Sequence, residues 1–414
     1  MRLLLAVAEP LVLTDGTLSA SEVRDLVAAA WEESSGARVD ACVLDPGADG
    51  FLRALADLAT EEVVTVARDT RGRDVPATFR LGPSAPGGAR TAYVEAAALR
   101  VTSSSAEDPA ASARTDRGDL GARTSYGVGQ VVAQAARLAS RVVVATGGLG
   151  AYDAGAGLVA ALAGQDDGPL TRGGAGLGEV GPADAAQVLV AREHLAGTEL
   201  VGAVDSDLPL LGLHGTNGAL ADADPALAVL AQELERAHGH WAHEVSRALA
   251  QASAGAAPRS LLAGPTAPAA RAAAGAAQAV RETSRALTTL PGAGAGGGLG
   301  FGLAALGARL LPGTAVVADV VGLDSRIVAA DLAVVVVDSL DASAVHEGAL
   351  PEVARRAAAL GLPVVVLARE VLAGRREQAA AGVSGAYELG RDEPSARARV
   401  GRVARTWSGR APSA

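Results

Sequence analysis

The chain has 414 residues, a net charge of −10 and only 2% aromatic residues, so any hydrophobic core must be built mainly from small aliphatic side chains. All 36 basic residues are arginine and they form no basic run, which disfavours nucleic acid and anionic membranes as partners and excludes any site built on lysine. The single cysteine allows no internal disulfide, and Glu9 and Pro10 interrupt the apolar start. Both features predict a cytoplasmic protein.

Short apolar runs rich in β-branched residues alternate along the chain with longer alanine-rich stretches, a pattern typical of a parallel α/β sheet with crossover helices. Ser19 and Glu22 have the spacing of a capping box, which predicts a helix from Ser19 to about Trp31. The predicted strands are residues 3–8, 39–44, 63–67, 92–95, 141–146, 200–204, 333–337 and 363–367.

Three segments are predicted to lie outside the packed core. Residues 165–182 are polar and rich in Gly and Pro, which is typical of a surface loop. Residues 250–281 are alanine-rich with prolines spread through them, which predicts a partly helical, mobile insertion. Residues 391–414 are polar and are expected to form a tail that frays.

The run Pro291-Gly-Ala-Gly-Ala-Gly-Gly-Gly-Leu-Gly300 is the first candidate ligand-binding segment. Glycines let backbone N–H groups approach an anion, and the N-terminus of a following helix adds partial positive charge. The run follows a helical stretch instead of a strand, so it does not fit the dinucleotide-binding motif. A tight glycine turn packed against a helix is the alternative.

A second glycine-rich segment, Thr146-Gly-Gly-Leu-Gly-Ala-Tyr-Asp153, comes directly after a predicted strand. This is where α/β folds place ligands, so Asp153 could hold Mg²⁺ or a substrate hydroxyl; equally, it could cap the helix that begins near Gly157. Upstream, Arg123 is the most attractive anion-binding cation, and Thr124 and Ser125 are either helix caps or phosphate donors.

Asp205 follows another predicted strand and is the better functional candidate of a pair, since Asp207 is expected to face solvent. The histidines at 238, 240 and 243 are expected on a solvated helix face, because no third metal ligand accompanies them.

Taken in order, these motifs resemble those of the bacterial glycerate kinase family, of the D-glycerate kinase type. The matching pieces are Thr17-Leu-Ser-Ala-Ser-Glu22, Ala48-Asp-Gly50, Tyr93-Val-Glu-Ala-Ala97, Thr124-Ser-Tyr-Gly-Val-Gly129, Gly147-Gly148 with Asp153-Ala-Gly-Ala-Gly157, Asp205 with Pro209-Leu-Leu-Gly212, and the run that ends at Gly300. Each piece alone is weak, but the ordered series covers most of the chain.

The resemblance implies two α/β domains: a three-layer, parallel-sheet domain formed by both chain ends, residues 1–75 and 290–390, and a second from residues 76–249. It implies ATP and Mg²⁺ if the protein is active, with a nucleotide and a small hydroxy acid meeting in a cleft. Carried over position by position, it gives catalytic roles to Asp153, Asp205 and Asp341. The implied substrate- and nucleotide-binding residues are Glu95, Arg123, Thr124, Ser125, Gly127, Gly129, Gly147, Gly148, Gly155, Gly292, Gly294, Gly296 and Gly297.

The departures from the family pattern fall on polar and charged positions, whereas the glycines are kept. Asp224 stands where the family has Lys, and Leu149, Ala151 and Tyr152 replace polar residues of the glycine-rich motif. In phosphoryl transfer, the loss of one well-placed cation costs ~10³–10⁵ in rate. Two alternatives are therefore predicted: ATP-dependent phosphorylation of D-glycerate, or a catalytically silent paralogue that binds a ligand or a partner protein.

Overall fold

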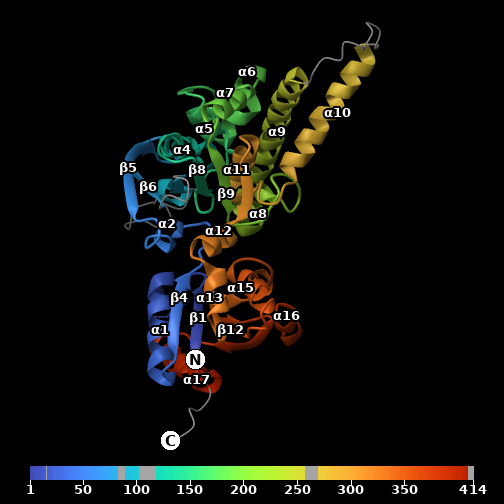
Figure 1. Ribbon diagram of the computed structural model, residues 1–414. Helices are drawn as coiled ribbons and strands as arrows, with labels where there is room; N and C mark the ends of the chain where they lie inside the picture. The colour runs from blue at the N-terminus through green and yellow to red at the C-terminus, as the bar shows by residue number, and fades with distance from the viewer. Residues whose placement is uncertain (15, 83–88, 102–117, 257–268, 409–414) are drawn as a thin grey trace, which may run out of the picture. The chain divides into compact units, whose positions relative to one another are not determined.

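The structure is a computed structural model that describes residues 1–14, 16–82, 89–101, 118–256 and 269–408 (Figure 1). The chain divides into two compact units: unit 1 comprises Met1–Leu58 and Pro312–Ala414, and unit 2 comprises Ala59–Leu311. The expected α/β class is confirmed, and both chain ends contribute to one unit.

The boundaries between the units differ from the expected ones at 75/76 and 289/290. Residues 61–81 form an antiparallel pair of strands that extends the sheet of unit 2. Residues 295–305 form a helix that is interrupted by left-handed glycines at 296–298 and packs on a strand of the same sheet. The glycine run at 291–300 therefore belongs to unit 2 and not to the domain formed by the chain ends.

Unit 1 is built on a five-stranded sheet in which every described pair of strands is parallel. The strand order is β13-β12-β11-β1-β4. The strands are β1 (Arg2–Val7), β4 (Arg38–Val43), β11 (Leu332–Leu340), β12 (Val364–Val371) and β13 (Val383–Glu388), and a separate hairpin is formed by β2 (Leu11–Leu13) and β3 (Gly16–Leu18). The helices are α1 (Ala20–Ser35), α2 (Phe51–Ala54), α12 (Gly313–Val320), α13 (Leu323–Val328), α14 (Ala342–His346), α15 (Ala349–Ala358), α16 (Arg375–Ala380) and α17 (Glu393–Trp407).

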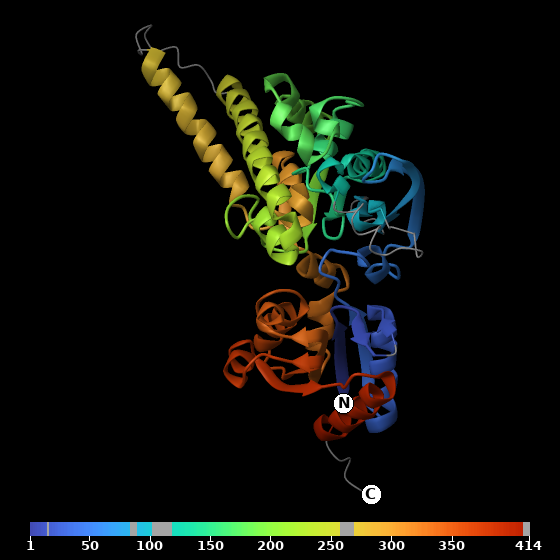
Figure 2. The same ribbon diagram turned by 180° about the vertical axis from the view of Figure 1, so that it is seen from behind.

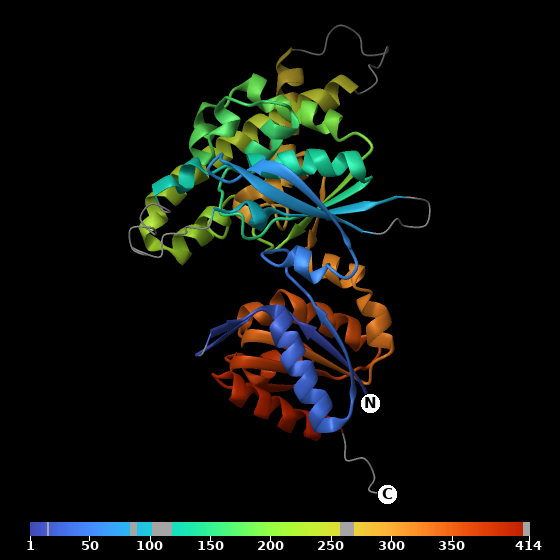
Figure 3. The same cartoon turned by 90° about the vertical axis from the view of Figure 1, so that its left-hand side faces the viewer.

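Helices cover both faces of this sheet and give the expected three layers. Figure 3 shows α1 and α17 side by side on one face, where Val27, Trp31 and Val400 are buried against alternate residues of β1. On the other side α15 packs on β1, β11 and β12. The predicted capping box at Ser19 and Glu22 is present and begins α1.

The tail expected to fray is largely a packed helix. Helix α17 buries Ala396, Val400, Val403 and Ala404, which recur at helical spacing and so form one apolar face. The polar residues between them occupy the solvent side, and for that reason the segment resembled a tail in the sequence.

Unit 2 is built on a mixed six-stranded sheet with the order β10-β9-β8-β7-β6-β5. The strands are β5 (Glu61–Arg68), β6 (Asp74–Leu81), β7 (Thr91–Glu95), β8 (Arg141–Ala145), β9 (Glu199–Val204) and β10 (Arg309–Pro312). The α-helices are α4 (Tyr126–Leu138), α5 (Ala156–Leu162), α6 (Pro182–Ala185), α7 (Gln187–His194), α8 (Thr216–Ala223), α9 (Ala228–Ala256), α10 (Ala269–Thr288) and α11 (Ala295–Ala305). The 3₁₀ helices are η1 (Ala96–Leu99), η2 (Leu120–Ala122), η3 (Pro169–Thr171), η4 (Gly174–Glu179) and η5 (Pro225–Leu227).

In the central part of this sheet β7, β8 and β9 run parallel, so their carboxyl ends lie at one edge. Helix α4 packs across β5 to β8, and α11 packs on β9. The segment 165–182, predicted as a surface loop, contains η3 and η4 and buries Leu170, Leu177 and Val180, so that prediction is wrong. Apolar residues spaced through a Gly- and Pro-rich stretch were the signal that it packs.

The predicted insertion at 250–281 is mostly helical in its described part. Helix α9 continues to Ala256, and α10 packs along it (Figure 2). Residues 257–268, which hold the three prolines of the segment, lie outside the described residues. The described side chains at 274–279 are exposed.

Within the described part of the chain, no helix is both long and apolar enough to cross a membrane.

Replacing residues 254–277 with a short Gly-Ser linker should leave a cooperative unfolding transition. The described side chains of this segment add little to the core, so their loss should remove little buried apolar area. Urea unfolding followed by circular dichroism measures the transition. Loss of cooperativity in the shortened protein would show that the helical pair is an integral part of unit 2.

Candidate functional site

The candidate site of unit 2 is assembled at the carboxyl edge of its parallel strands. Glu95 ends β7 and lies in register with Ala145, the last residue of β8, which in turn lies in register with Ala203 of β9. Thr146 and the glycine-rich turn at 147–150 follow β8, and Asp205 follows β9. Ligands of α/β sheets bind at such edges.

Asp205 is the carboxylate that this edge presents, as the sequence predicted. Its Oδ1 accepts a hydrogen bond from the buried Thr146 hydroxyl at 3.1 Å. Burial raises the pKa of Asp205 above its usual range. Burial and the charge of Asp205 raise the pKa of Tyr152, which places that phenol near the carboxylate. A carboxylate with a raised pKa is suited to accept a proton from a substrate hydroxyl. Asp207, expected to face solvent, is exposed.

Arginines supply positive charge on the other side of the same turn. The Nη1 of Arg100 donates to the carbonyl oxygen of Gly148 at 3.1 Å. The Arg123 side chain, only 8% exposed, pairs with Asp119 at 2.8 Å, and Arg71 pairs with the same carboxylate. Burial acts to raise the pKa of Asp119, but its bonds to Arg71 and Arg123 dominate and lower it below the usual range.

Both Arg100 and Arg123 flank Gly150. A Cβ at Gly150 would lie 3.7 Å from Cγ of Arg100 and 3.8 Å from Nη1 of Arg123. Arg123 was predicted from the sequence, whereas Arg71 and Arg100 were not. Their position within a few residues of predicted strands was the signal that could have found them.

The turn itself offers backbone donors. Gly148 and Gly150 have φ values of 73° and 71°, a left-handed conformation that glycine adopts without strain. Among the described residues, the N–H groups of Gly147, Gly148 and Gly150 donate no hydrogen bond within the protein. Free N–H groups between a carboxylate and two guanidinium groups favour binding of a small organic anion.

Asp153 does not face this turn as a ligand group. Its Oδ2 accepts from the backbone N–H of Ser125 at 2.7 Å, from the Ser125 hydroxyl at 2.9 Å, from the Thr124 hydroxyl at 3.2 Å and from the N–H of Gly157 at 3.1 Å. Its Oδ1 accepts from the N–H of Gly155 at 3.0 Å.

These bonds favour the capping alternative for Asp153. The carboxylate satisfies free N–H groups near the starts of α4 and α5, which is a capping role. Asp153, Thr124 and Ser125 are all at most 6% exposed, so the expected ligand contacts of these three side chains are replaced by an internal network.

Most of the glycines predicted to bind substrate or nucleotide are closely packed against other parts of the chain. A Cβ at any of them would lie too close to a neighbouring group of the protein: Gly127 to Arg68, Gly129 to Leu158, Gly155 to Gly302, Gly292 to Val204, Gly294 to Pro209, Gly296 to Thr146 and Gly297 to Ala151. The run at 292–297 thus lies directly against the turn after β8, as a packed contact.

Asp341 is placed by the structure in unit 1, whereas Asp153 and Asp205 lie in unit 2. It caps α14, and its Oδ1 accepts from the N–H of Ala344 at 3.0 Å. Burial and the nearby charges of Asp338 and Asp341 raise the pKa of Glu9, so these three acids gather at one edge of the sheet of unit 1.

Metal binding by protein groups alone is not supported at these positions. Among the described residues, no group of three or more His, Cys, Asp or Glu side chains could hold a metal ion. Mg²⁺ needs fewer protein ligands when substrate phosphates complete its coordination, and Asp205 is the carboxylate that could serve in that case.

His238 contacts the backbone at Tyr152, just after the glycine-rich turn. This role was not predicted from the sequence. His238 was expected on a solvated helix face but is fully buried in α9. Its Nε2 lies 3.0 Å from the carbonyl oxygen of Tyr152 and its Nδ1 lies 3.0 Å from Nδ2 of Asn217. Because a carbonyl can only accept, Nε2 carries the proton, and Nδ1 accepts from the amide.

Acid should therefore destabilise the folded protein through His238. Burial lowers its pKa below the usual 6.5, so the stability that it contributes is present above about pH 6.5 and is lost as the pH falls further. Urea unfolding at about pH 7.5 and about pH 5.5 should give a smaller pH-dependent loss of unfolding free energy for His238→Gln than for the natural protein. His243→Gln, at an exposed position of the same helix, is the control. An unchanged loss in His238→Gln would contradict the assignment.

Comparison with known proteins identifies one family. A family model described as the glycerate kinase family matches residues 14–408. An uncharacterized protein of Mycobacterium tuberculosis is 29% identical over 266 residues, which is 64% of this chain and 55% of the relative. This chain thus spans little more than half the length of that relative. The glycerate kinase of Bacillus subtilis is 25% identical over 335 residues, 78% of this chain and 74% of that protein.

A solved structure has a similar fold. The crystal structure of "putative glycerate kinase 2" from Salmonella typhimurium LT2 aligns with 99% of this chain and 97% of its own, with a TM-score of 0.64 and 23% sequence identity. At this identity the match shows the shared fold alone.

Proposed function

Because the chain belongs to the glycerate kinase family, we propose that unit 2 binds a small hydroxy-carboxylate anion of the D-glycerate class and that phosphoryl transfer from ATP is slow or absent. One observation carries this proposal. The turn at 146–150 has a half-buried carboxylate at its start, Asp205, which is hydrogen-bonded to Thr146. It also has two guanidinium groups, Arg100 at Gly148 and Arg123 at Gly150.

This arrangement matches the two ends of a hydroxy acid. A ligand carboxylate would lie at the guanidinium groups and the free N–H groups of the turn, since charge-assisted hydrogen bonds of this kind are strong. A ligand hydroxyl would donate to Asp205, whose raised pKa suits it as a proton acceptor. Thr146 would hold the Asp205 carboxylate in place.

Phosphoryl transfer is expected to be slow because the turn has few polar side chains. Leu149 and Ala151 are each 1% exposed and bring no polar group, and Asp153 is occupied by five hydrogen bonds from its own protein. Positioning and charge stabilisation supply nearly all of the catalysis in phosphoryl transfer, so a site with few polar side chains aimed at the reactants should be slow.

A second candidate is a working D-glycerate kinase that uses ATP and Mg²⁺. The observation that favours it is that Arg100 and Arg123 bring guanidinium groups to the turn in a chain without lysine. In that case Asp205 would be the protein ligand of Mg²⁺, which neutralises charge on the phosphates. Turnover decides between the two candidates.

Binding is tested by thermal unfolding with D-glycerate. A ligand at ~100 times its dissociation constant should stabilise the protein by about 2.7 kcal/mol, and Arg123→Gln should remove most of this effect. Arg172→Gln is the control, because Arg172 pairs with Glu179 at an exposed position of the same unit. No stabilisation of the natural protein, or equal loss in both variants, would overturn the proposal.

A further inference from the structure

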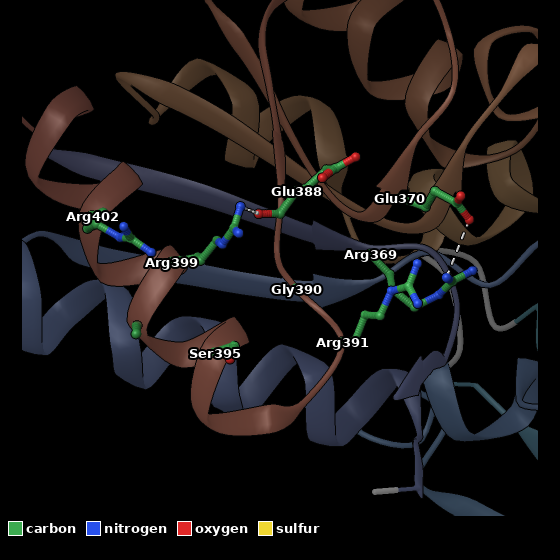
Figure 4. Close-up of a pocket in the computed structure, with 9 residues that line it drawn as sticks. Arg369, Glu370, Glu388, Gly390, Arg391, Ser395, Arg399 and Arg402 are labelled. Carbon is green, nitrogen blue, oxygen red and sulfur yellow. Dashed lines mark hydrogen bonds and ion pairs between the residues drawn. The ribbon is translucent and has the colours of Figure 1, made fainter. Parts of the chain in front are cut away.

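A pocket of about 500 Å³ opens in unit 1, between the carboxyl-terminal part of β12, the end of β13 and the first half of α17 (Figure 4). Its volume is in the range that holds a small-molecule ligand. Four of the residues that line it are arginines: Arg369 of β12, Arg391 in the loop before α17, and Arg399 and Arg402 on α17.

Three of these four arginines have no acidic partner within the described part of the chain. Arg399 donates only to the backbone carbonyl of Glu388, at 3.3 Å, and neither Arg391 nor Arg402 forms an ion pair there. Arg369 differs, because it pairs with Asp338 at 2.8 Å and with Glu370 at 3.4 Å. Like charges held close together repel each other, so an arginine group of this kind favours an anion.

The two glutamates of the pocket do not cancel this charge. Glu370 faces Arg369, and Glu388 accepts a weak bond from the N–H of Val371 at 3.4 Å. Figure 4 shows Arg369 and Arg391 at one end of the pocket and Arg399 with Arg402 at the other. The fold brings these side chains together from three segments, so no basic run marks the site in the sequence.

We propose that this pocket binds a small ligand carrying two linked phosphates. The planar guanidinium group matches the oxygen geometry of phosphate, and the two separated pairs of arginines fit two phosphates better than one. Arg399 and Arg402 are three residues apart and so share one face of α17. Glu370 and Glu388 also line the pocket, and Figure 4 shows Glu388 between the two pairs of arginines.

This site is separate from the one proposed for the hydroxy acid. All of its lining residues belong to unit 1, whereas Arg100, Arg123 and Asp205 belong to unit 2. One proposal can therefore be contradicted without affecting the other, and different variants test them.

The test is calorimetric titration of the full-length protein with inorganic pyrophosphate. The double variant Arg399→Gln/Arg402→Gln should raise the dissociation constant by at least about tenfold, because two charge-assisted contacts are lost. Arg397→Gln is the matched control: Arg397 lies on the same helix but pairs with Glu33 outside the pocket, so its dissociation constant should not change. Arg123→Gln should likewise retain the natural affinity.

Four results would overturn the proposal. The first is the absence of any heat of pyrophosphate binding to the natural protein, and the second is an unchanged dissociation constant in the double variant. The third is a loss of affinity in Arg397→Gln equal to that in the double variant, and the fourth is a loss of pyrophosphate binding in Arg123→Gln. A parallel titration with inorganic phosphate tests the number of phosphates, and an equal affinity for the single ion would contradict the linked pair. Arg399 and Arg402 are exposed, so the double variant should unfold at the same temperature as the natural protein.

Discussion

Replacing Gly297 with alanine is expected to lower the free energy of unfolding by about 2–6 kcal/mol, through backbone strain and overpacking together. Gly297 has a φ of 68°, which a residue with a Cβ rarely adopts, and the added atom would overlap the carbonyl oxygen of Ala151. Gly296 and Gly298 on either side are also left-handed, so the backbone there has little freedom to shift away from the clash.

The matched control is Gly164→Ala. Gly164 has a similar φ of 75°, but nothing lies within 4 Å of a Cβ built there, so only the backbone strain of about 1 kcal/mol is expected. Urea unfolding of the two variants separates strain from the packing contact. An equal loss of unfolding free energy in both variants would contradict this explanation. Glycine at 297 would then be required by its backbone conformation and not by the close contact with the turn after β8.

This contact also explains why the glycine run resembled a ligand-binding loop. Glycine is needed wherever a backbone approaches another group closely, and the other group can be a phosphate or another part of the chain. The sequence shows where the glycines are, but it does not show whether a ligand or another part of the chain lies against them. At positions 292–297 the neighbours are Val204, Pro209, Thr146 and Ala151, so the alternative of a packed turn is the one the structure supports.

The strands were predictable because their signals are local. All eight predicted strands are present, since buried parallel strands such as β11, with Ala333 to Val337 all at most 3% exposed, are continuous apolar runs. Strands β6, β10 and β13 and the hairpin were missed. In β6 the sequence includes Asp74, Pro76 and Arg80, which are typical of an exposed antiparallel strand near a sheet edge and weaken the apolar pattern.

The charged groups of the candidate site were less predictable than the strands. Asp205 follows β9 directly, and its place at the edge could be inferred from the strand alone. Arg71 and Arg100 follow predicted strands, but their partners, Asp119 and the carbonyl group of Gly148, could not be read from spacing. The same holds for His238, whose burial depends on how α9 packs against the backbone at Tyr152.

With ATP, Mg²⁺ and D-glycerate, the purified protein is expected to turn over at least about 10³-fold more slowly than ordinary kinases, which reach about 1–100 per second. A departure from the family motifs, an acid in place of a lysine, suggests the direction. Asp224 stands at a family Lys position, and its Oδ1 accepts a hydrogen bond from the N–H of Ala226 at 3.1 Å, so it is fixed at the start of η5. An acid there would repel both the nucleotide and the hydroxy acid.

Restoring one lysine should not rescue the rate. Asp224→Lys removes the negative charge but also the cap of η5, and it returns none of the polar side chains missing at Leu149 and Ala151. The effects of catalytic groups that act as a unit are not additive, so one restored group should raise the rate little.

Coupled detection of ADP measures the turnover of the natural protein and of Asp224→Lys. Asp205→Asn is the control, since any activity that survives it comes from another enzyme in the preparation. Turnover of the natural protein within the ordinary range, lost in Asp205→Asn, would instead establish the working kinase, whose cationic side chains would have to be arginines because the chain has no lysine.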